Sequence, residues 1–215
     1  MLEQPQGGPG WSPSATVVLG FSGLTASVGD HIGHFYQTHE EWQQVLIPYL
    51  KTGLEAGDKC VYLMRPNPDW RGLREALAAA HIDLATALAS GQLVLDEGRA
   101  TPEELREWFT SVIAETSGRF RLLRWGGDMT WSLRQTSTSE RLMVWESMCN
   151  TFANPPAVFL CQYDLTQFLG SVVIDALKTH PLCIIGSAIH QNPFYEQPEV
   201  FLEALRRRHA ARQAL

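Results

Sequence analysis

The chain lacks the sequence motif with which many nucleotide-binding α/β proteins hold phosphate. No GxxxxGK[ST] segment occurs in its 215 residues, and that segment supplies the amides and the Lys that cradle phosphate. The GxSxG and HExxH signatures of hydrolases and metalloproteases are missing as well. Tight binding or hydrolysis of ATP is therefore not expected, and no known catalytic motif points to an enzyme.

Other absences indicate where the protein works. The sequence has no apolar run of 18 residues that could span a membrane, and its N-terminus has no secretory signal. Its four cysteines contain no CxxC pair, and Cys60, Cys161 and Cys183 each lie in an apolar, strand-like run. We expect buried, reduced thiols in a cytoplasmic protein without membrane contacts.

An excess of basic residues is also missing. The chain has 17 Lys and Arg against 23 Asp and Glu, a net charge of -6, which argues against direct nucleic-acid binding. The three arginines 206–208 are expected to complement the dipole at the end of a last helix. Residues 1–14, rich in Gly, Pro, Gln and Ser, predict a disordered leader, and residues 15–215 predict one domain.

The segment from Asp30 to Asp58 carries the strongest structural pattern. A strand over 32–36 is followed by Thr38, a good helix N-cap, and Glu41 three residues later completes a capping box. A helix with one apolar face then leads to a strand over 59–64. This strand–loop–helix–strand order begins a parallel α/β domain, and the bulky residues 34–38 occupy the place of a phosphate loop.

The rest of the chain continues the alternation. Strands are predicted over 15–19, 92–96, 119–125, 158–162 and 182–185, with a break at Gly126 and Gly127. Helices are predicted over 69–80, 84–89, from Thr101 to 116, over 139–152, from an Asp164 cap to 178, and from about 198. The predicted fold is a three-layer α/β domain with a mainly parallel sheet flanked by helices.

Ligands of such sheets bind at the carboxyl ends of the strands. In this chain those ends carry aromatic and polar residues that could form one small-molecule site. The candidate ligand-binding residues are His34, Tyr36, Arg65, Asp128, Trp131, Tyr163, Asp164 and Tyr195. Trp131 is expected to supply apolar area, and His34 or Tyr36 a polar contact, because ligand pockets combine the two.

A metal site is the weaker alternative for the histidines. His31 and His34 form an HxxH pair, but residues three apart on a strand point to opposite faces. Cys161 and His180 could add ligands, although sequence spacing does not fix their distance. We therefore expect no metal and no cofactor, with His31 at the surface, His34 hydrogen-bonded near the strand end and Cys161 an inert buried thiol.

Seven segments occur in an order that resembles the MEDS family, the sensory domain of dichloromethane-responsive regulators of methylotrophs and of methanogen proteins. The segments are HIGHFYQT at 31–38, LKTGLEAG at 50–57, SGQLV at 90–94, GDMTW at 127–131, CQYD at 161–164, THP at 179–181 and NPFY at 192–195. The resemblance implies a RecA/KaiC-like fold that has lost its phosphate loop. It also implies a non-catalytic sensor of small hydrocarbon derivatives in signal transduction or transcription regulation.

Members of that family are often joined to DNA-binding or kinase modules, and no second module follows residue 215 here. We therefore expect signalling through a separate signalling or transcription-regulatory protein. Two other functions stay open. One is an enzyme that uses Asp128 or Asp164 with His34 as acid and base, and the other is a protein-interaction module whose pocket is vestigial. The sequence does not fix the oligomeric state.

Overall fold

The computed structural model describes residues 16–64, 70–133, 139–152 and 155–213. The predicted leader and Arg65 lie outside these residues. The main sheet of the described chain has seven strands in the order β5 (Leu93–Asp96), β4 (Lys59–Leu63), β6 (Leu123–Asp128), β7 (Ala157–Asp164), β3 (His31–Tyr36), β8 (Leu182–Ile185) and β9 (Ala188–Gln191). All neighbouring pairs are parallel except β8 with β9. This confirms the predicted mainly parallel α/β fold.

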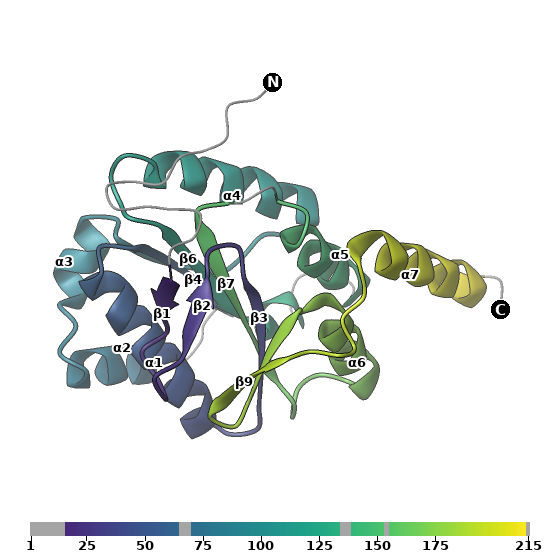
Figure 1. The fold of residues 1–215 in the computed structure, drawn as a ribbon, viewed down its shortest axis with the longest axis horizontal. Helices are drawn as coiled ribbons and strands as arrows, with labels where there is room; N and C mark the ends of the chain where they lie inside the picture. The colour runs from purple at the N-terminus through teal and green to yellow at the C-terminus, as the bar shows by residue number, and fades with distance from the viewer. Residues whose placement is uncertain (1–15, 65–69, 134–138, 153–154, 214–215) are drawn as a thin grey trace.

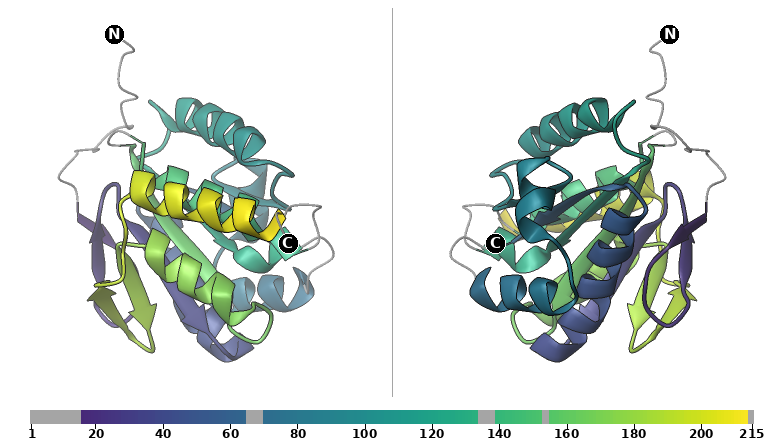
Figure 2. Two further views of the ribbon diagram at one scale, coloured as in Figure 1. Left: turned by 90° about the vertical axis from the view of Figure 1, so that its right-hand side faces the viewer. Right: turned by 90° about the vertical axis from the view of Figure 1, so that its left-hand side faces the viewer.

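Helices cover both faces of this sheet (Figures 1 and 2). One face carries α1 (His39–Glu55), α2 (Trp70–Ala79) and α3 (Leu84–Ala89). The other carries α4 (Pro102–Thr116), the 3-10 helix η1 (Met129–Leu133), α5 (Ser139–Cys149), α6 (Gly170–Thr179) and α7 (Pro198–Gln213). None of the described helices is long and apolar enough to cross a membrane.

Strand β7 shows why the sheet has two cores. Val158 and Leu160 pack with α1, whereas Phe159, Cys161 and Tyr163 pack with α4, α5 and α6. Successive side chains of a strand point to opposite faces. A central strand must therefore be apolar at both odd and even positions, which is the continuous pattern that the sequence shows.

The predicted helix starts are confirmed at α1 and α4. Thr38 Oγ1 accepts from the Glu41 amide at 3.1 Å, and Glu41 Oε2 accepts from the Thr38 amide at 3.2 Å. Thr101 and Glu104 make the same pair of bonds before α4, with Pro102 at its first position. Both capping boxes satisfy amides that have no partner within the helix.

The predicted break at Gly126 and Gly127 was wrong, because β6 runs through both residues to Asp128. The glycines are needed inside the sheet. A Cβ at Gly127 would lie 2.9 Å from the Leu63 Cβ, and one at Gly126 would lie 3.0 Å from the Leu160 carbonyl oxygen. Glycine here marks close packing of the neighbouring strands and helix layer, and it does not mark a turn.

Two further predictions were wrong, whereas the predicted strand at the start of the domain is present. Asp164 does not cap a helix, because its carboxylate accepts from the amide and hydroxyl of Thr166, and α6 begins only at Gly170. The predicted strand over 15–19 is β1 (Thr16–Val18), which pairs with β2 (Thr25–Ser27) in a separate two-stranded sheet. Arginines 206–208 lie within α7, where Arg208 donates to Asp175 of α6 at 2.8 Å.

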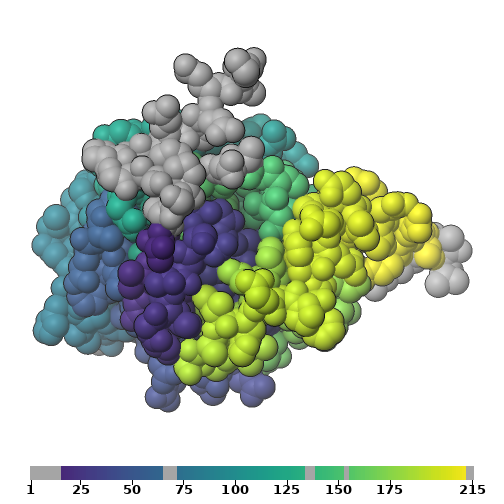
Figure 3. Space-filling view, in the orientation of Figure 1, coloured from purple at the N-terminus to yellow at the C-terminus, as the bar shows by residue number. Residues whose placement is uncertain are grey.

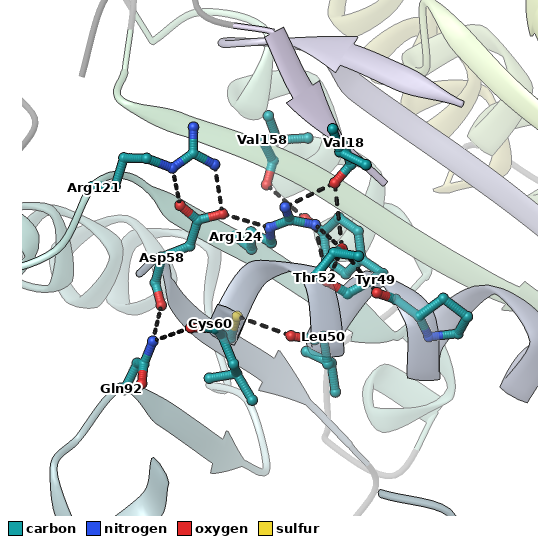
Figure 4. Close-up of polar contacts among 12 residues, drawn as sticks. Val18, Tyr49, Leu50, Thr52, Asp58, Cys60, Gln92, Arg121, Arg124 and Val158 are labelled. Atoms are coloured by element: carbon teal, nitrogen blue, oxygen red, sulfur yellow. Dashed lines mark hydrogen bonds and ion pairs between the residues drawn. The ribbon is translucent and has the colours of Figure 1, made fainter. Parts of the chain in front are cut away.

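A buried ion-pair network joins α1, β1, β4 and β6 at the amino ends of the strands (Figure 4), and we call it the Asp58 network. Asp58 accepts two bonds from Arg121, at 2.7 and 2.9 Å, and one from Arg124 Nε at 2.7 Å. Arg124 also donates to the carbonyl oxygens of Tyr49 and Val18, at 2.9 and 2.8 Å. Each charge is thus enclosed by groups that satisfy it.

Candidate functional site

A pocket of about 650 Å³ opens at the carboxyl ends of β3 and β8. The turns of the two hairpins β1–β2 and β8–β9 border it, and these hairpins lie side by side on the face shown in Figure 3. Its apolar wall comes from Phe21, Phe35, Val45, Leu165, Val173, Leu177 and Ile185. Its polar residues are Ser22, His34, Gln37, Glu41, Gln44 and Ser187. The pocket stands where ligands of parallel sheets bind.

The amino terminus of α1, which begins beside this pocket, is occupied by the protein's own carboxylate. Glu41 Oε2 accepts from the Gln37 amide at 2.7 Å and from the Thr38 amide at 3.2 Å. A phosphate loop offers the amides at the start of this helix to phosphate. Here the Gln37 and Thr38 amides at this terminus bind the Glu41 carboxylate.

A chain of hydrogen bonds fixes the state of His34. Trp42 Nε1 donates to the Tyr62 hydroxyl at 2.8 Å, and this hydroxyl donates to Gln162 Oε1 at 2.7 Å. The Gln162 amide nitrogen therefore donates to His34 Nδ1, at 2.9 Å. Burial lowers the pKa of His34 to about 4, although Glu41 opposes the shift. His34 is neutral at pH 7, with its proton on Nε2.

The other predicted site residues within the described chain do not line this pocket. Tyr36 is buried, with its ring centre 5.7 Å from that of His34. Asp128 accepts from the amide and hydroxyl of Thr130, at 3.0 and 2.7 Å, and so repeats the turn that Asp164 makes with Thr166. Both acids thus shape the chain where a strand ends.

Trp131 and Tyr163 lie in the core on the opposite face of the sheet. Trp131 is 1% exposed and packs on Gly98, where a Cβ would lie 2.7 Å from its ring. Tyr163 is fully buried and donates its hydroxyl proton to Glu146. Tyr195 is half-buried beyond β9. Of the predicted residues within the described chain, His34 is the one that lines the pocket.

A second group of polar residues is buried between the sheet and α5, and we call it the histidine cluster. It comprises His31, Glu146, Cys161 and His180, whose ligand atoms all lie within 4.8 Å of one another. His31 is 1% exposed, so its predicted surface position was wrong. His34 lies on the other face of β3, as strand alternation predicts, and takes no part.

Sequence reasoning missed Glu146. Leu142, Glu146 and Cys149 fall at positions i, i+4 and i+7, which place all three on one face of α5. Because Leu142 and Cys149 belong to the core, this spacing carries the carboxylate inside with them. An acid within a buried helical stripe was the available indication, since carboxylates are rarely buried without partners.

The outer contacts of the cluster fix its two imidazoles. Asn150 Nδ2 donates to the carbonyl oxygens of Glu146 and Thr179, so Asn150 Oδ1 accepts from His31 Nδ1, at 3.2 Å. His180 Nδ1 lies 2.6 Å from the Ala176 carbonyl oxygen, which can only accept. Both rings therefore carry a proton on Nδ1 and direct Nε2 into the cluster.

Burial and charge act strongly on these groups. Burial lowers the pKa of His31 to about 4, with His180 acting in the same direction and Glu146 opposing. Burial alone would raise the pKa of Glu146, but the two imidazoles outweigh it and hold this pKa well below its usual range. Burial raises the pKa of the Cys161 thiol well above its usual value, in agreement with the predicted unreactive thiol.

The described chain is an α/β protein with a mainly parallel seven-stranded sheet, and its sequence has no phosphate loop. A solved structure, the KaiC-like protein PH0186 from Pyrococcus horikoshii OT3, superposes with a TM-score of 0.60 at 12% identity. The match covers 86% of this chain and 92% of that one. At this identity the likeness concerns the fold.

The family follows from the sequence comparisons. Residues 30–181 match the MEDS family, described as the methanogen/methylotroph DcmR sensory domain, and the chain belongs to this family. The transcriptional repressor DcmR of Methylorubrum extorquens (strain DM4) is 29% identical over 165 residues. That alignment covers 74% of this chain and 61% of the repressor, so the chain spans about six-tenths of that relative's length.

Proposed function

We propose that this chain is a non-catalytic sensor domain of a cytoplasmic transcription-regulatory system, and that a small, uncharged, weakly polar molecule binds the pocket beside β3. The observation that carries the proposal is that a carboxylate of the protein binds the amides at the start of α1. The amides that would hold phosphate bind Glu41, and an apolar pocket opens beside them. The nucleotide site of the fold is thereby converted into a site for another class of ligand.

The pocket's chemistry indicates this ligand class. A volume of about 650 Å³ lies within the range of small-molecule sites, roughly 300–1,000 Å³. Phe35, Val173 and Leu177 offer apolar area, and neutral His34 offers a ring N–H donor. The Glu41 carboxylate disfavours anions. A small hydrocarbon derivative with one acceptor atom fits these properties, in keeping with the resemblance of the sequence to hydrocarbon sensors.

The enzymatic alternative has less support. Its two acids, Asp128 and Asp164, are each engaged by a threonine of their own turn. His34 Nδ1 accepts from Gln162, and its lowered pKa of about 4 makes it a weak base at pH 7. A pure interaction module would not need an apolar pocket lined by a polar network of fixed orientation, so this alternative is also less favoured.

Transfer of the ligand's effect involves the elements that line the pocket. These include α1, α6 and the turns of the β1–β2 and β8–β9 hairpins. The 3-10 helix η1 follows β6 but packs in the core on the opposite face of the sheet, so we assign it no part in this transfer. A ligand held between the hairpins would fix their relative position. This change would be read by a separate signalling or transcription-regulatory protein.

A pair of adjacent substitutions tests the proposal. Val173 lines the pocket, whereas Ile174, the next residue of α6, is 54% exposed. A panel of small halogenated and oxygenated hydrocarbons, including dichloromethane, is screened by melting temperature and tryptophan fluorescence. At least one compound should stabilise the wild-type protein, Val173→Phe should lose the response, and Ile174→Phe should keep it.

Two results contradict the proposal. In one, no compound of the panel changes the melting temperature of the wild-type protein. In the other, both variants respond equally. Mass spectrometry of each bound compound after incubation separates sensing from catalysis, because a sensor returns the compound unchanged.

A further inference from the structure

We propose that His31, Glu146, Cys161 and His180 form a closed, four-coordinate binding site for one zinc-class divalent cation. The four residues come from β3, α5, β7 and the segment between α6 and β8. They are at most 1% exposed. The site lies on the opposite face of the sheet from His34, and none of its four residues lines the proposed sensing pocket.

The distances suit tetrahedral ligation. His31 Nε2 lies 3.0 Å from Glu146 Oε2 and 3.4 Å from Cys161 Sγ, and His180 Nε2 lies 3.4 Å from Glu146 Oε2. Zinc bound to nitrogen or oxygen at about 2.0–2.1 Å and to sulfur at about 2.3 Å places tetrahedral ligand atoms about 3.3–3.6 Å apart. These three distances are close to the bound spacing, and all four ligand atoms lie within 4.8 Å of one another, so side-chain rotations can bring them onto one ion.

The donor atoms already have the orientation that a metal requires. The Nδ1 protons of His31 and His180 are donated outward, to Asn150 Oδ1 and to the Ala176 carbonyl oxygen. Tyr163 donates its hydroxyl proton to Glu146 Oε1, at 2.7 Å, which leaves Oε2 directed inward. Metal-binding histidines and carboxylates are held by outer contacts of this kind.

Without a cation the interior of the cluster is incomplete. His180 Nε2 is buried and has no hydrogen-bond partner within the described part of the chain. His31 Nε2 faces Glu146 Oε2 at 3.0 Å, and both atoms carry lone pairs when the ring is neutral. Buried polar atoms normally have partners. A single cation among the four atoms would satisfy His180 Nε2 and separate the two facing lone pairs.

The ligand types and charges select the metal class. Two imidazoles and a thiolate favour zinc and its neighbours over magnesium or calcium, which prefer oxygen. Binding converts the Cys161 thiol to a thiolate, and its proton leaves to solvent. The Glu146 carboxylate and the Cys161 thiolate then balance the charge of a dication. The bound site is neutral, as a buried site needs to be.

Glycine at position 33 supports the arrangement. A Cβ there would lie 3.0 Å from His180 Cγ, so the His180 ring packs directly on the backbone of β3.

The cluster also borders the sensing pocket indirectly. Tyr163, which holds Glu146, stacks on Phe35 with ring centres 5.5 Å apart, and Phe35 lines the pocket. A bound ion would hold this wall of the pocket in place.

The test measures metal in the full chain and probes its ligands with cobalt. The protein purified without chelators should contain about one zinc per chain. After removal of zinc, Co²⁺ should give the absorption of a tetrahedral site together with a thiolate-to-metal band. Cys161→Ser should lose the thiolate band and bind zinc on the order of 100-fold more weakly or worse, because even outer-shell changes typically cost 10–100-fold. Cys183→Ser, a buried thiol outside the cluster, should match the wild type.

The outcomes decide the proposal even if a variant fails to fold. A folded wild-type protein that contains no stoichiometric zinc and shows no thiolate band with Co²⁺ overturns it. So does a Cys161→Ser protein that binds cobalt like the wild type. If Cys161→Ser does not fold, the wild-type spectrum and Asn150→Ala decide instead. Asn150→Ala frees the His31 ring and should weaken zinc binding about 10–100-fold, and unchanged affinity would contradict the proposal.

Discussion

Two buried, charged groups on opposite faces of one sheet differ in how completely their polar atoms are paired. In the Asp58 network, Asp58 receives three hydrogen bonds from two arginines, and Arg124 donates three further bonds to two backbone carbonyl oxygens and a hydroxyl oxygen. In the histidine cluster, His180 Nε2 has no hydrogen-bond partner within the described residues and lies 3.4 Å from Glu146 Oε2, and with its proton on Nδ1 the His31 ring offers Glu146 no proton. Asp58 and Arg124 are as deeply buried as the four residues of the cluster, so burial does not explain the difference.

The difference distinguishes a network that stabilises the fold from a group of residues that can bind a ligand. A network that is complete within the protein needs nothing else, and it fixes the packing of α1 against β4 and β6. The histidine cluster differs. Its outer contacts are complete, but its inward-facing atoms lack partners, as expected for residues that hold a bound ion. The inward atoms of the histidine cluster are nitrogen, sulfur and carboxylate oxygen atoms that bind metals. A metal cation is therefore the ligand that fits them.

The largest expected effect comes from breaking the complete network. Asp58→Ala leaves the buried Arg124 charge unpaired, which typically costs about 3–5 kcal/mol. Urea unfolding should show this loss with zinc and with chelator alike. Glu203→Ala, which removes an exposed ion pair with Arg207 on α7, serves as control and should change stability by less than about 1 kcal/mol. A loss below about 1 kcal/mol for Asp58→Ala would contradict the assigned structural role.

A second effect concerns pH. Burial lowers the folded-state pKa of His34 from 6.5 to about 4, so the unfolded chain takes up the proton first. This destabilises the protein as pH falls from about 6.5 to about 4, by up to about 3 kcal/mol in all. His34→Gln should remove that part of the pH dependence. His190→Gln, in the exposed strand β9, should retain it, and identical pH profiles for His34→Gln and wild type would contradict the assignment.

Two glycines sharpen the comparison between the networks. A Cβ at Gly53 would lie 2.5 Å from Arg124 Cδ, and one at Gly33 would lie 3.0 Å from His180 Cγ. Both substitutions by Ala should destabilise the protein by about 1–3 kcal/mol through overpacking, although Ala normally favours a helix at Gly53. Only Gly33→Ala should also weaken zinc binding.

Gly170→Ala is the matched control for these glycines, because no atom lies within 4 Å of its added Cβ. It should leave both stability and zinc affinity nearly unchanged. Equal zinc affinities for Gly33→Ala and Gly170→Ala would show that the His180 ring does not depend on the space above β3.

The smallest expected effect is that of ATP. Because Glu41 takes the amides at the start of α1, Mg-ATP should neither raise the melting temperature nor release measurable heat on titration. A micromolar dissociation constant would show that the nucleotide site has survived in another form.

The sequence predicted the fold where local chemistry decides structure. The Thr38 capping box, the helix start at Thr101 and the continuous apolar strand of β7 depend on neighbouring residues, and they were predicted correctly. Gly126 and Gly127 were misread because their role depends on Leu63 and Leu160 from other strands. Local sequence cannot report such contacts.

The candidate site was harder to predict for the same reason. The position of His34 at a strand end correctly predicted that it lies near the pocket. Trp131 and Tyr163 also lie near strand ends, but their side chains pack in the core on the opposite face of the sheet. The histidine cluster joins residues up to 149 positions apart, from His31 to His180. The HxxH spacing suggested His34 as the partner of His31. The actual partner is Glu146, an acid within a buried helical stripe.

We expect a cation to complete the histidine cluster, whereas the Asp58 network is complete without one. The direct test is the free energy of unfolding measured in zinc buffers, from excess chelator to micromolar free zinc. Above the dissociation constant it should rise by about 1.4 kcal/mol for each tenfold increase in free zinc, the slope for one ion per chain. Asp58→Ala should show the same slope from a lower start. A free energy of unfolding that does not change with zinc would contradict the claim.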